Sequence, residues 1–176
     1  IGRSLLRAVY ESSAAEAIKI VAINELSDSS TIAHLTRYDS THGRFPGSVR
    51  SDGLKLYINE DEIQLFAEIL VERLPWEQLE IDAVLECSGT FSDRNTAEGH
   101  LSSGAKKVLF SQPAEADVDA TIVFGVNHHM LRKEQTIVPN ASCTTNAVVP
   151  LLKLHNVNYG LKSGVLTTIH SAMNDQ

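Results

Sequence analysis

Short apolar runs alternate with amphipathic segments along most of the chain. The β-branched run at residues 18–23 predicts a buried strand that ends at Glu25. Asp28 or Ser29 can cap the first turn of one segment of helical periodicity, and Asp93 can cap the first turn of another. By the same criteria we expect a helix at residues 5–10, buried strands at 82–87, 107–110 and 121–126, and alternating antiparallel strands at 49–58 and 63–70.

The order of these elements predicts the fold class. Short apolar strands separated by helices are typical of a parallel sheet covered on both faces. Residues 1–142 are therefore expected to form an α/β domain with a doubly wound parallel sheet of the Rossmann type. A long helix is expected at 143–155, with a kink or a late start at Pro150, and a strand at 163–169. Residues 143–176 are interpreted as the beginning of a truncated α+β domain.

Charge and composition exclude several classes of partner. The net charge is −7, and the largest basic cluster is the pair Lys106-Lys107, so nucleic acid and anionic membranes are not expected to bind. No apolar run approaches the ~18 residues of a membrane span. Two cysteines give no disulfide framework, which favours a reducing cytoplasm. The chain begins at Ile1 with the pattern of a helix already under way, and we expect a piece of a longer protein.

Cys143 is the candidate nucleophile. It is placed at the start of the long helix, where free backbone N–H groups and the helix dipole favour a thiolate. Its small polar neighbours Ser142, Thr144, Thr145 and Asn146 offer donors for an oxyanion, although these residues alone leave a structural role open. Cys87 follows an apolar strand and is expected to be a core or cofactor-wall residue. The chain shows no pattern of metal ligands, since His128 and His129 are adjacent and have no matching pair.

A dinucleotide site is suggested by residues at strand ends. Ile1-Gly2 fits the tail of a glycine-rich turn, and Glu25 ends a strand about twenty residues later, where an acid accepts hydrogen bonds from a ribose and repels a 2′-phosphate. This favours NAD over NADP, and the alternative is that Glu25 is only a solvated residue. Ser88, Gly89 and Ser111 also follow strands, where doubly wound sheets bind their ligands.

The run Ala141-Ser142-Cys143-Thr144-Thr145-Asn146 resembles the active-site signature of the glyceraldehyde-3-phosphate dehydrogenase superfamily. Segments at 38–44, 104–108 and 125–127 are similar to that superfamily as well. The resemblance implies an NAD-dependent dehydrogenase that is a homotetramer at full length. It also implies that Cys143 attacks an aldehyde, that His170 acts as acid and base, and that Ser142 and Thr144 contact the substrate.

Within the superfamily, the chain resembles the erythrose-4-phosphate dehydrogenase group. The similarity lies in Glu25, in segments 74–76, 119–121 and 169–173, and in Met173, which stands where glyceraldehyde enzymes carry a phosphate-binding threonine. This group forms 4-phosphoerythronate by hydrolysis of a thioester, in pyridoxal 5′-phosphate (vitamin B6) biosynthesis. The alternatives are a phosphorylating glyceraldehyde-3-phosphate dehydrogenase of glycolysis and a non-catalytic NAD-binding fragment.

The chain also departs from the superfamily's pattern. Ala147 replaces a second cysteine that has no catalytic duty, and Ile69 replaces an arginine that contacts the cofactor. The first strand and most of the catalytic domain of the superfamily have no counterpart in the sequence. We therefore expect this piece to fold poorly and to be inactive alone.

Overall fold

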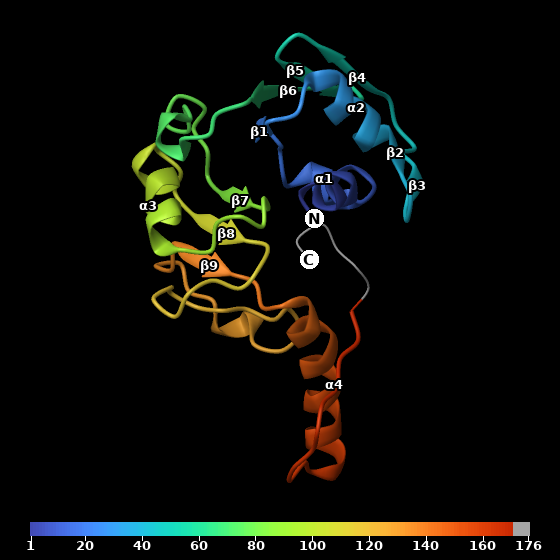
Figure 1. The fold of residues 1–176 in the computed structure, drawn as a ribbon, viewed down its shortest axis with the longest axis vertical. Coiled ribbons are helices and arrows are strands. Elements are labelled where there is room, and N and C mark those ends of the chain that lie inside the picture. Colours follow the sequence, from blue (N-terminus) through green and yellow to red (C-terminus); the bar gives the residue numbers. More distant parts are fainter. Residues whose placement is uncertain (171–176) are drawn as a thin grey trace.

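The computed structural model describes residues 1–170, and their strands form three sheets (Figure 1). The first sheet has the order β1-β6-β5-β4, with β1 parallel to β6 and the other pairs antiparallel. The second has the order β7-β8-β9 and is parallel throughout. The strands of these two sheets are β1 (Ala22–Asn24), β4 (Val49–Asp52), β5 (Lys55–Ile58), β6 (Asp61–Phe66), β7 (Val84–Glu86), β8 (Val108–Phe110) and β9 (Ile137–Pro139).

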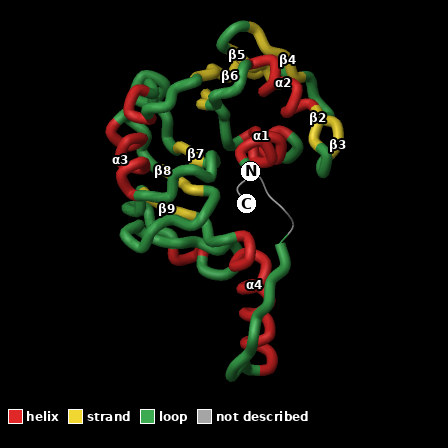
Figure 2. The backbone as a smooth tube through the Cα atoms, viewed as in Figure 1, coloured by secondary structure: helices red, strands yellow, loops and turns green. Residues whose placement is uncertain are grey.

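Helices and short turns connect these strands. The α-helices are α1 (Gly2–Tyr10), α2 (Ser29–Arg37), α3 (Arg94–Ser102) and α4 (Cys143–Tyr159). Three short 3₁₀ helices, η1 (Ser13–Glu16), η2 (Val71–Arg73) and η3 (His128–Met130), and the small antiparallel sheet of β2 (Tyr38–Asp39) and β3 (Gly43–Arg44) complete the described elements. The connection between β8 and β9 is mostly loop, and α4 extends away from the sheets (Figure 2).

The α/β class with parallel strands of the Rossmann type is confirmed, although residues 1–170 divide these strands between two sheets. In a dinucleotide-binding sheet the strand order is 3-2-1-4-5-6. The pair β6-β1 matches positions 3 and 2 of that order, and β7-β8-β9 matches positions 4, 5 and 6. Among the described residues, β1 and β7 each have one strand neighbour, and position 1 is not filled.

Three apolar clusters hold these elements together. One packs α1 and α2 onto the first sheet through Leu6, Ile32, Leu56 and Ile63, which are all buried. A second packs α3 onto the parallel sheet and contains Ala97, Val108, Phe110 and Ile137. The third contains Leu74, Trp76 and Ala105 and contacts Ala22 and Phe66 of the first sheet as well as Val84 of the second. This third cluster therefore joins the two sheets.

The helix starts predicted at Asp28 and Asp93 are confirmed, and the predicted antiparallel strands form β4, β5 and β6, although β6 ends at Phe66 and α1 begins at Gly2, before the expected residue 5. The Asp28 carboxylate accepts hydrogen bonds from the backbone N–H groups of Ser30 and Thr31, both at 3.0 Å, and α2 begins directly after it. These bonds and those from the hydroxyls of the same two residues hold the pKa of Asp28 well below its usual value. Asp93 caps α3 in the same way, through Thr96.

Two predicted strands are wrong. Residues 121–126 form no strand and contribute only an isolated bridge between Ile122 and Asn140. The side chain of Asn127 closes this segment into a turn, because it accepts the N–H of Val123 and donates to the carbonyl of Thr121. Residues 163–169 are also not a strand, since no described strand pairs with them, and they are exposed.

The long helix differs from its predicted extent. It begins at Cys143 as expected, continues through Pro150 without a late start, and ends at Tyr159. The domain boundary at residue 142 stays a prediction, although it falls between β9 and α4. In the part of the chain that the structure describes, no helix is both long enough and apolar enough to span a membrane.

Gly104 provides a test of this packing. Its φ is +111°, and a Cβ there would lie 2.4 Å from the backbone nitrogen of Glu77. Both the backbone conformation and the lack of space therefore exclude a side chain. We expect Gly104→Ala to lower the free energy of unfolding of the full-length protein by about 3 kcal/mol or more. Gly53→Ala is the control, since Gly53 also has a positive φ but faces open space. It should lose only about 1–2 kcal/mol. Equal losses in denaturant titrations would contradict the predicted clash.

Candidate active site

The candidate nucleophile lies at an exposed helix start. Cys143 is the first residue of α4, and its side chain is exposed. Ser142 caps this helix, with its Oγ accepting the N–H of Thr145 at 3.0 Å. The N–H groups of Cys143 and Thr144 have no acceptor among residues 1–170, as is usual in a first helical turn. The thiol is therefore next to two backbone N–H groups that could donate hydrogen bonds to an oxyanion.

The loop before Cys143 is fixed by Asn146. Its Nδ2 donates to the Asn140 side chain and to the carbonyls of Ala141 and Ser142, each at 3.0 Å. The N–H of Asn140 donates in turn to the carbonyl of Phe110 at 2.8 Å, at the end of β8. Asn146 was expected to donate to an oxyanion, and this expectation is wrong for its amide group, which is engaged with the loop. No residue pattern predicts this role, because the acceptors are mainly backbone carbonyls.

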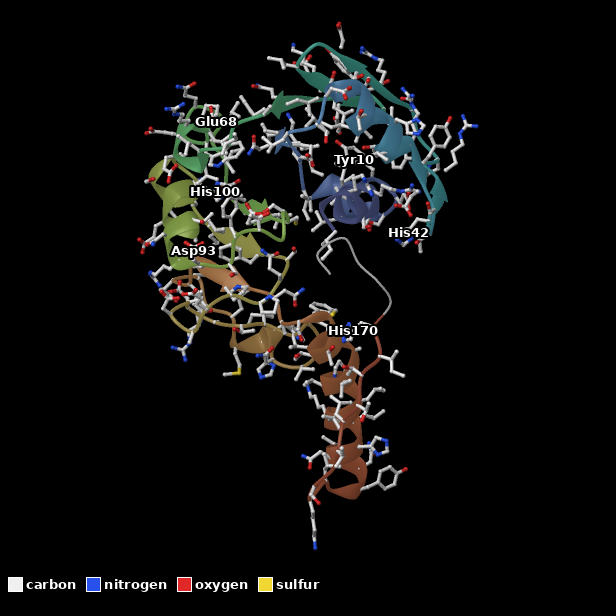
Figure 3. The ribbon with its side chains drawn as sticks, in the orientation of Figure 1. Tyr10, His42, Glu68, Asp93, His100 and His170 are labelled. Atoms are coloured by element: carbon white, nitrogen blue, oxygen red, sulfur yellow. The ribbon has the colours of Figure 1, made fainter. Side chains whose placement is uncertain are left out.

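His170 approaches the same helix start from the far end of the described chain. Its Nε2 lies 3.3 Å from Oγ1 of Thr144 and 3.3 Å from Oγ1 of Thr168 (Figure 3). The structure thus brings His170 beside the residue that follows Cys143, although 26 residues separate His170 from Thr144. Thr144, which is expected to contact the substrate, is in the first turn of α4, and its hydroxyl contacts His170. Met173 lies outside the described residues.

The first turn of α1 packs against the end of β7. A Cβ on Gly2 would lie 3.2 Å from Cβ of Cys87, so only a glycine allows this close approach without displacement. Ile1 is the N-cap residue and provides no side-chain cap. The predicted Ile1-Gly2 and Ser88-Gly89 segments are therefore neighbours. Gly89 has a φ of +76° and open space where a Cβ would stand.

The other predicted cofactor residues follow neighbouring strands. Ser111 comes directly after β8 and donates its N–H to the carbonyl of Glu86 at 2.9 Å, next to Ser88. Glu25 comes directly after β1, and its exposed carboxylate accepts the N–H and hydroxyl of Ser27, both at 3.3 Å. The set combines an uncapped helix start, a glycine in close contact, and an acid at a strand end. These residues fit a dinucleotide, with the helix start suited to its pyrophosphate and Glu25 to its ribose.

Cys87, which is expected to be a core or cofactor-wall residue, comes directly after β7. It is half-buried beneath Gly2. Burial raises the pKa of the Cys87 thiol, an effect that a hydrogen bond with Ser111 only partly offsets and that the neighbouring Glu86 charge reinforces. A thiol kept neutral in this way is a poor nucleophile.

Two family models match the chain. The model described as glyceraldehyde 3-phosphate dehydrogenase, NAD binding domain, matches residues 1–94. The model described as glyceraldehyde 3-phosphate dehydrogenase, C-terminal domain, matches residues 142–176. The first match contains Gly2, Glu25 and Ser88, and the second contains Cys143 and His170.

Glu25 offers a test of the cofactor site. We expect Glu25→Gln to weaken the binding of NAD to the full-length protein about tenfold, because the neutral amide is a weaker acceptor for the ribose hydroxyls. The same change should improve the relative binding of NADP, since a negative charge no longer opposes its 2′-phosphate. Isothermal titration with each dinucleotide measures both effects. Glu60→Gln, at an exposed turn, is the control and should bind both as the parent does. An unchanged ratio of the two affinities would remove Glu25 from the site.

Proposed function

The chain belongs to the glyceraldehyde 3-phosphate dehydrogenase family, with NAD as its cofactor, and we propose that it oxidises a phosphorylated aldehyde through a covalent intermediate on Cys143. One observation carries the proposal. The exposed thiol stands at the start of α4, and His170 is held beside that start by its contact with Thr144. A nucleophile and a base at one helix start are the pair that acyl chemistry on a thiol requires.

The proposed chemistry follows from these groups. His170 takes the proton of the Cys143 thiol, and Sγ adds to the aldehyde carbon while the carbonyl oxygen becomes an oxyanion. The N–H groups of Cys143 and Thr144 stabilise that oxygen, which His170 then protonates. When the oxygen gives its proton back to His170, the carbon releases a hydride and a thioester remains on Cys143. NAD, when bound, accepts the hydride. His170 releases its proton to solvent and then takes a proton from the attacking acceptor, which adds to the thioester carbon, and the sulfur leaves as a thiolate.

The proposed cofactor site lies along the carboxyl ends of the strands. The first turn of α1, at Ile1 and Gly2, is assigned to the pyrophosphate, and Glu25 to the adenosine ribose. Ser88, Gly89 and Ser111 are assigned to the part of the cofactor that lies across the ends of β7 and β8. Their support is the contact between Gly2 and Cys87 and the hydrogen bond from Ser111 to the Glu86 carbonyl.

For the aldehyde we propose erythrose 4-phosphate, with water as the acceptor and 4-phosphoerythronate as the product. The support is in the sequence, namely the resemblance of the segments around Glu25 and His170 and the position of Met173. A methionine cannot donate the hydrogen bond that a threonine gives to phosphate, so the acceptor and the aldehyde should change together. A second candidate is the phosphorylating oxidation of glyceraldehyde 3-phosphate, which is favoured by the description of both matched families.

A comparison of substrates tests the choice between the two aldehydes. We expect the full-length protein to reduce NAD faster with erythrose 4-phosphate than with glyceraldehyde 3-phosphate, at a rate that added inorganic phosphate does not raise. NADH absorbance, with and without phosphate, measures this directly. Phosphate-dependent turnover that is much faster with glyceraldehyde 3-phosphate would establish the second candidate instead.

A substitution tests the role of the thiol. We expect Cys143→Ser to lower kcat by at least about 10³-fold, because a serine hydroxyl is a far weaker nucleophile without a strong base. The dissociation constant for NAD should stay within about twofold of the parent value, since Cys143 is not among the proposed cofactor contacts. Stopped assays and NAD titration on the same preparation give both numbers. Full turnover in this variant would exclude the covalent mechanism.

A further inference from the structure

A buried polar chain runs from the apolar layer between the two sheets to the candidate cofactor loop. Trp76, His100 and Glu86 are buried, with exposed fractions of 5%, 3% and 8%. They come from the segment after η2, from α3 and from the last position of β7. The His100 side chain extends from α3 toward Glu86 at the end of β7 (Figure 3). No part of the mechanism above uses these three side chains.

The first contact of the chain determines where the histidine carries its proton. The indole Nε1–H of Trp76 donates to Nδ1 of His100 at 3.0 Å. An indole nitrogen is only a donor, so Nδ1 must be an acceptor and the proton of the neutral ring is on Nε2. That Nε2–H is buried without a hydrogen-bond partner among the described residues, and Oε2 of Glu86 lies 3.5 Å from Nε2.

The second contact joins Glu86 to the loop. Its Oε1 accepts the backbone N–H of Ser88 at 2.7 Å, and the Ser88 hydroxyl accepts the N–H of Thr90 at 3.2 Å. Burial by itself would raise the pKa of Glu86, but the nearby His100 ring and hydrogen bonds from Ser88 bring it below its usual value. A charged carboxylate is thus kept in a largely buried place by partners on both sides.

We propose that His100 is a positioning residue for NAD, which acts through Glu86 to fix the loop at residues 87–90. The inference rests on the proposed cofactor role of Ser88 and Gly89. His100 contacts neither the cofactor nor the reacting atoms. It orients the Glu86 carboxylate, and that carboxylate determines where the Ser88 N–H and the Gly89 turn stand relative to the first turn of α1. Without the Nε2–H, the buried Glu86 carboxylate has one polar neighbour fewer. Its side chain is then expected to turn toward water or toward the loop, where other donors are available.

Two amide substitutions separate the two contacts of the ring. His100→Asn places an amide near the Nδ1 position, where it still accepts the Trp76 N–H, but it does not extend to Glu86. His100→Gln extends an amide N–H toward Glu86 but gives up the acceptor for Trp76. We expect His100→Asn to raise the dissociation constant of NAD about tenfold and to leave kcat at saturating NAD within about threefold. His100→Gln should bind NAD within about threefold of the parent.

A role in core packing alone predicts the opposite order, since the loss of the Trp76 bond would then matter most. The controls are His34→Gln, an exposed histidine on α2, and the thermal midpoint of every variant. Trp76 is the only tryptophan in the chain, so its fluorescence shows which variant has disturbed its surroundings.

A second variant keeps the test decisive if His100→Asn does not fold. Glu86→Gln retains an acceptor for Ser88 but loses the charge that faces Nε2–H, and it too should weaken NAD binding in full-length protein. NAD is titrated without aldehyde, so failure of the proposed substrate leaves this measurement intact. The inference is overturned if Glu86→Gln binds NAD as the parent does, or if His100→Gln weakens binding as much as His100→Asn.

Discussion

The hydrogen bond from Trp76 to His100 lies in the side-chain cluster that joins the two sheets. Residues 1–170 contain no strand that pairs with both β1 and β7, so the cluster around Trp76 connects the sheets through apolar contacts. The indole ring packs edge-to-face on Phe66 of the first sheet, with ring centroids 6.1 Å apart. Apolar contacts are not directional, whereas the N–H of a buried indole requires one acceptor. His100 supplies it and thereby selects one orientation of the ring.

This constraint extends to both halves of the cofactor site. Ala22 of β1 contacts the Trp76 cluster, and Glu25 follows that strand, so the cluster helps to position the acid that we propose binds the ribose. On the other side, His100 faces Glu86, which holds Ser88. The close approach of Gly2 to Cys87 adds a third link, because α1 packs on the first sheet and touches the second. The proposed dinucleotide site is thus assembled from two sheets whose relative position is set by a few buried contacts.

Local signals in the sequence predicted the elements, and nonlocal contacts account for what they missed. The caps at Asp28 and Asp93 and the start of α4 at Cys143 follow from side chains that bond within their own turn. The apolar runs at 121–126 and 163–169 have strand-like patterns, but a strand also needs a partner, which periodicity does not reveal. The contact between Trp76 and His100 was missed for the same reason, since the two residues are 24 positions apart in the sequence. The structural role of Asn146 was missed although its acceptors lie within six residues, because two of the three are backbone carbonyls, which no residue pattern marks.

The nucleophile owes its position to bonds at the start of its helix and little to the burial of the helix itself. None of the described residues of α4 is buried, so packing along its length does not hold it (Figure 1). Asn146 ties the loop before Cys143 to the helix, the Asn140 N–H ties that loop to Phe110, and Lys153 donates to the carbonyls of Gly125 and Val126. These bonds fix the position of the thiol relative to β8 and β9, whereas the position of the loop at Ser88 is fixed relative to β7. Because β7, β8 and β9 form one parallel sheet, the Cys143 thiol and the proposed cofactor loop both lie at the edge formed by the carboxyl ends of its strands. Displacement of α4 beyond its first turns should therefore leave the geometry between the thiol and the loop unchanged.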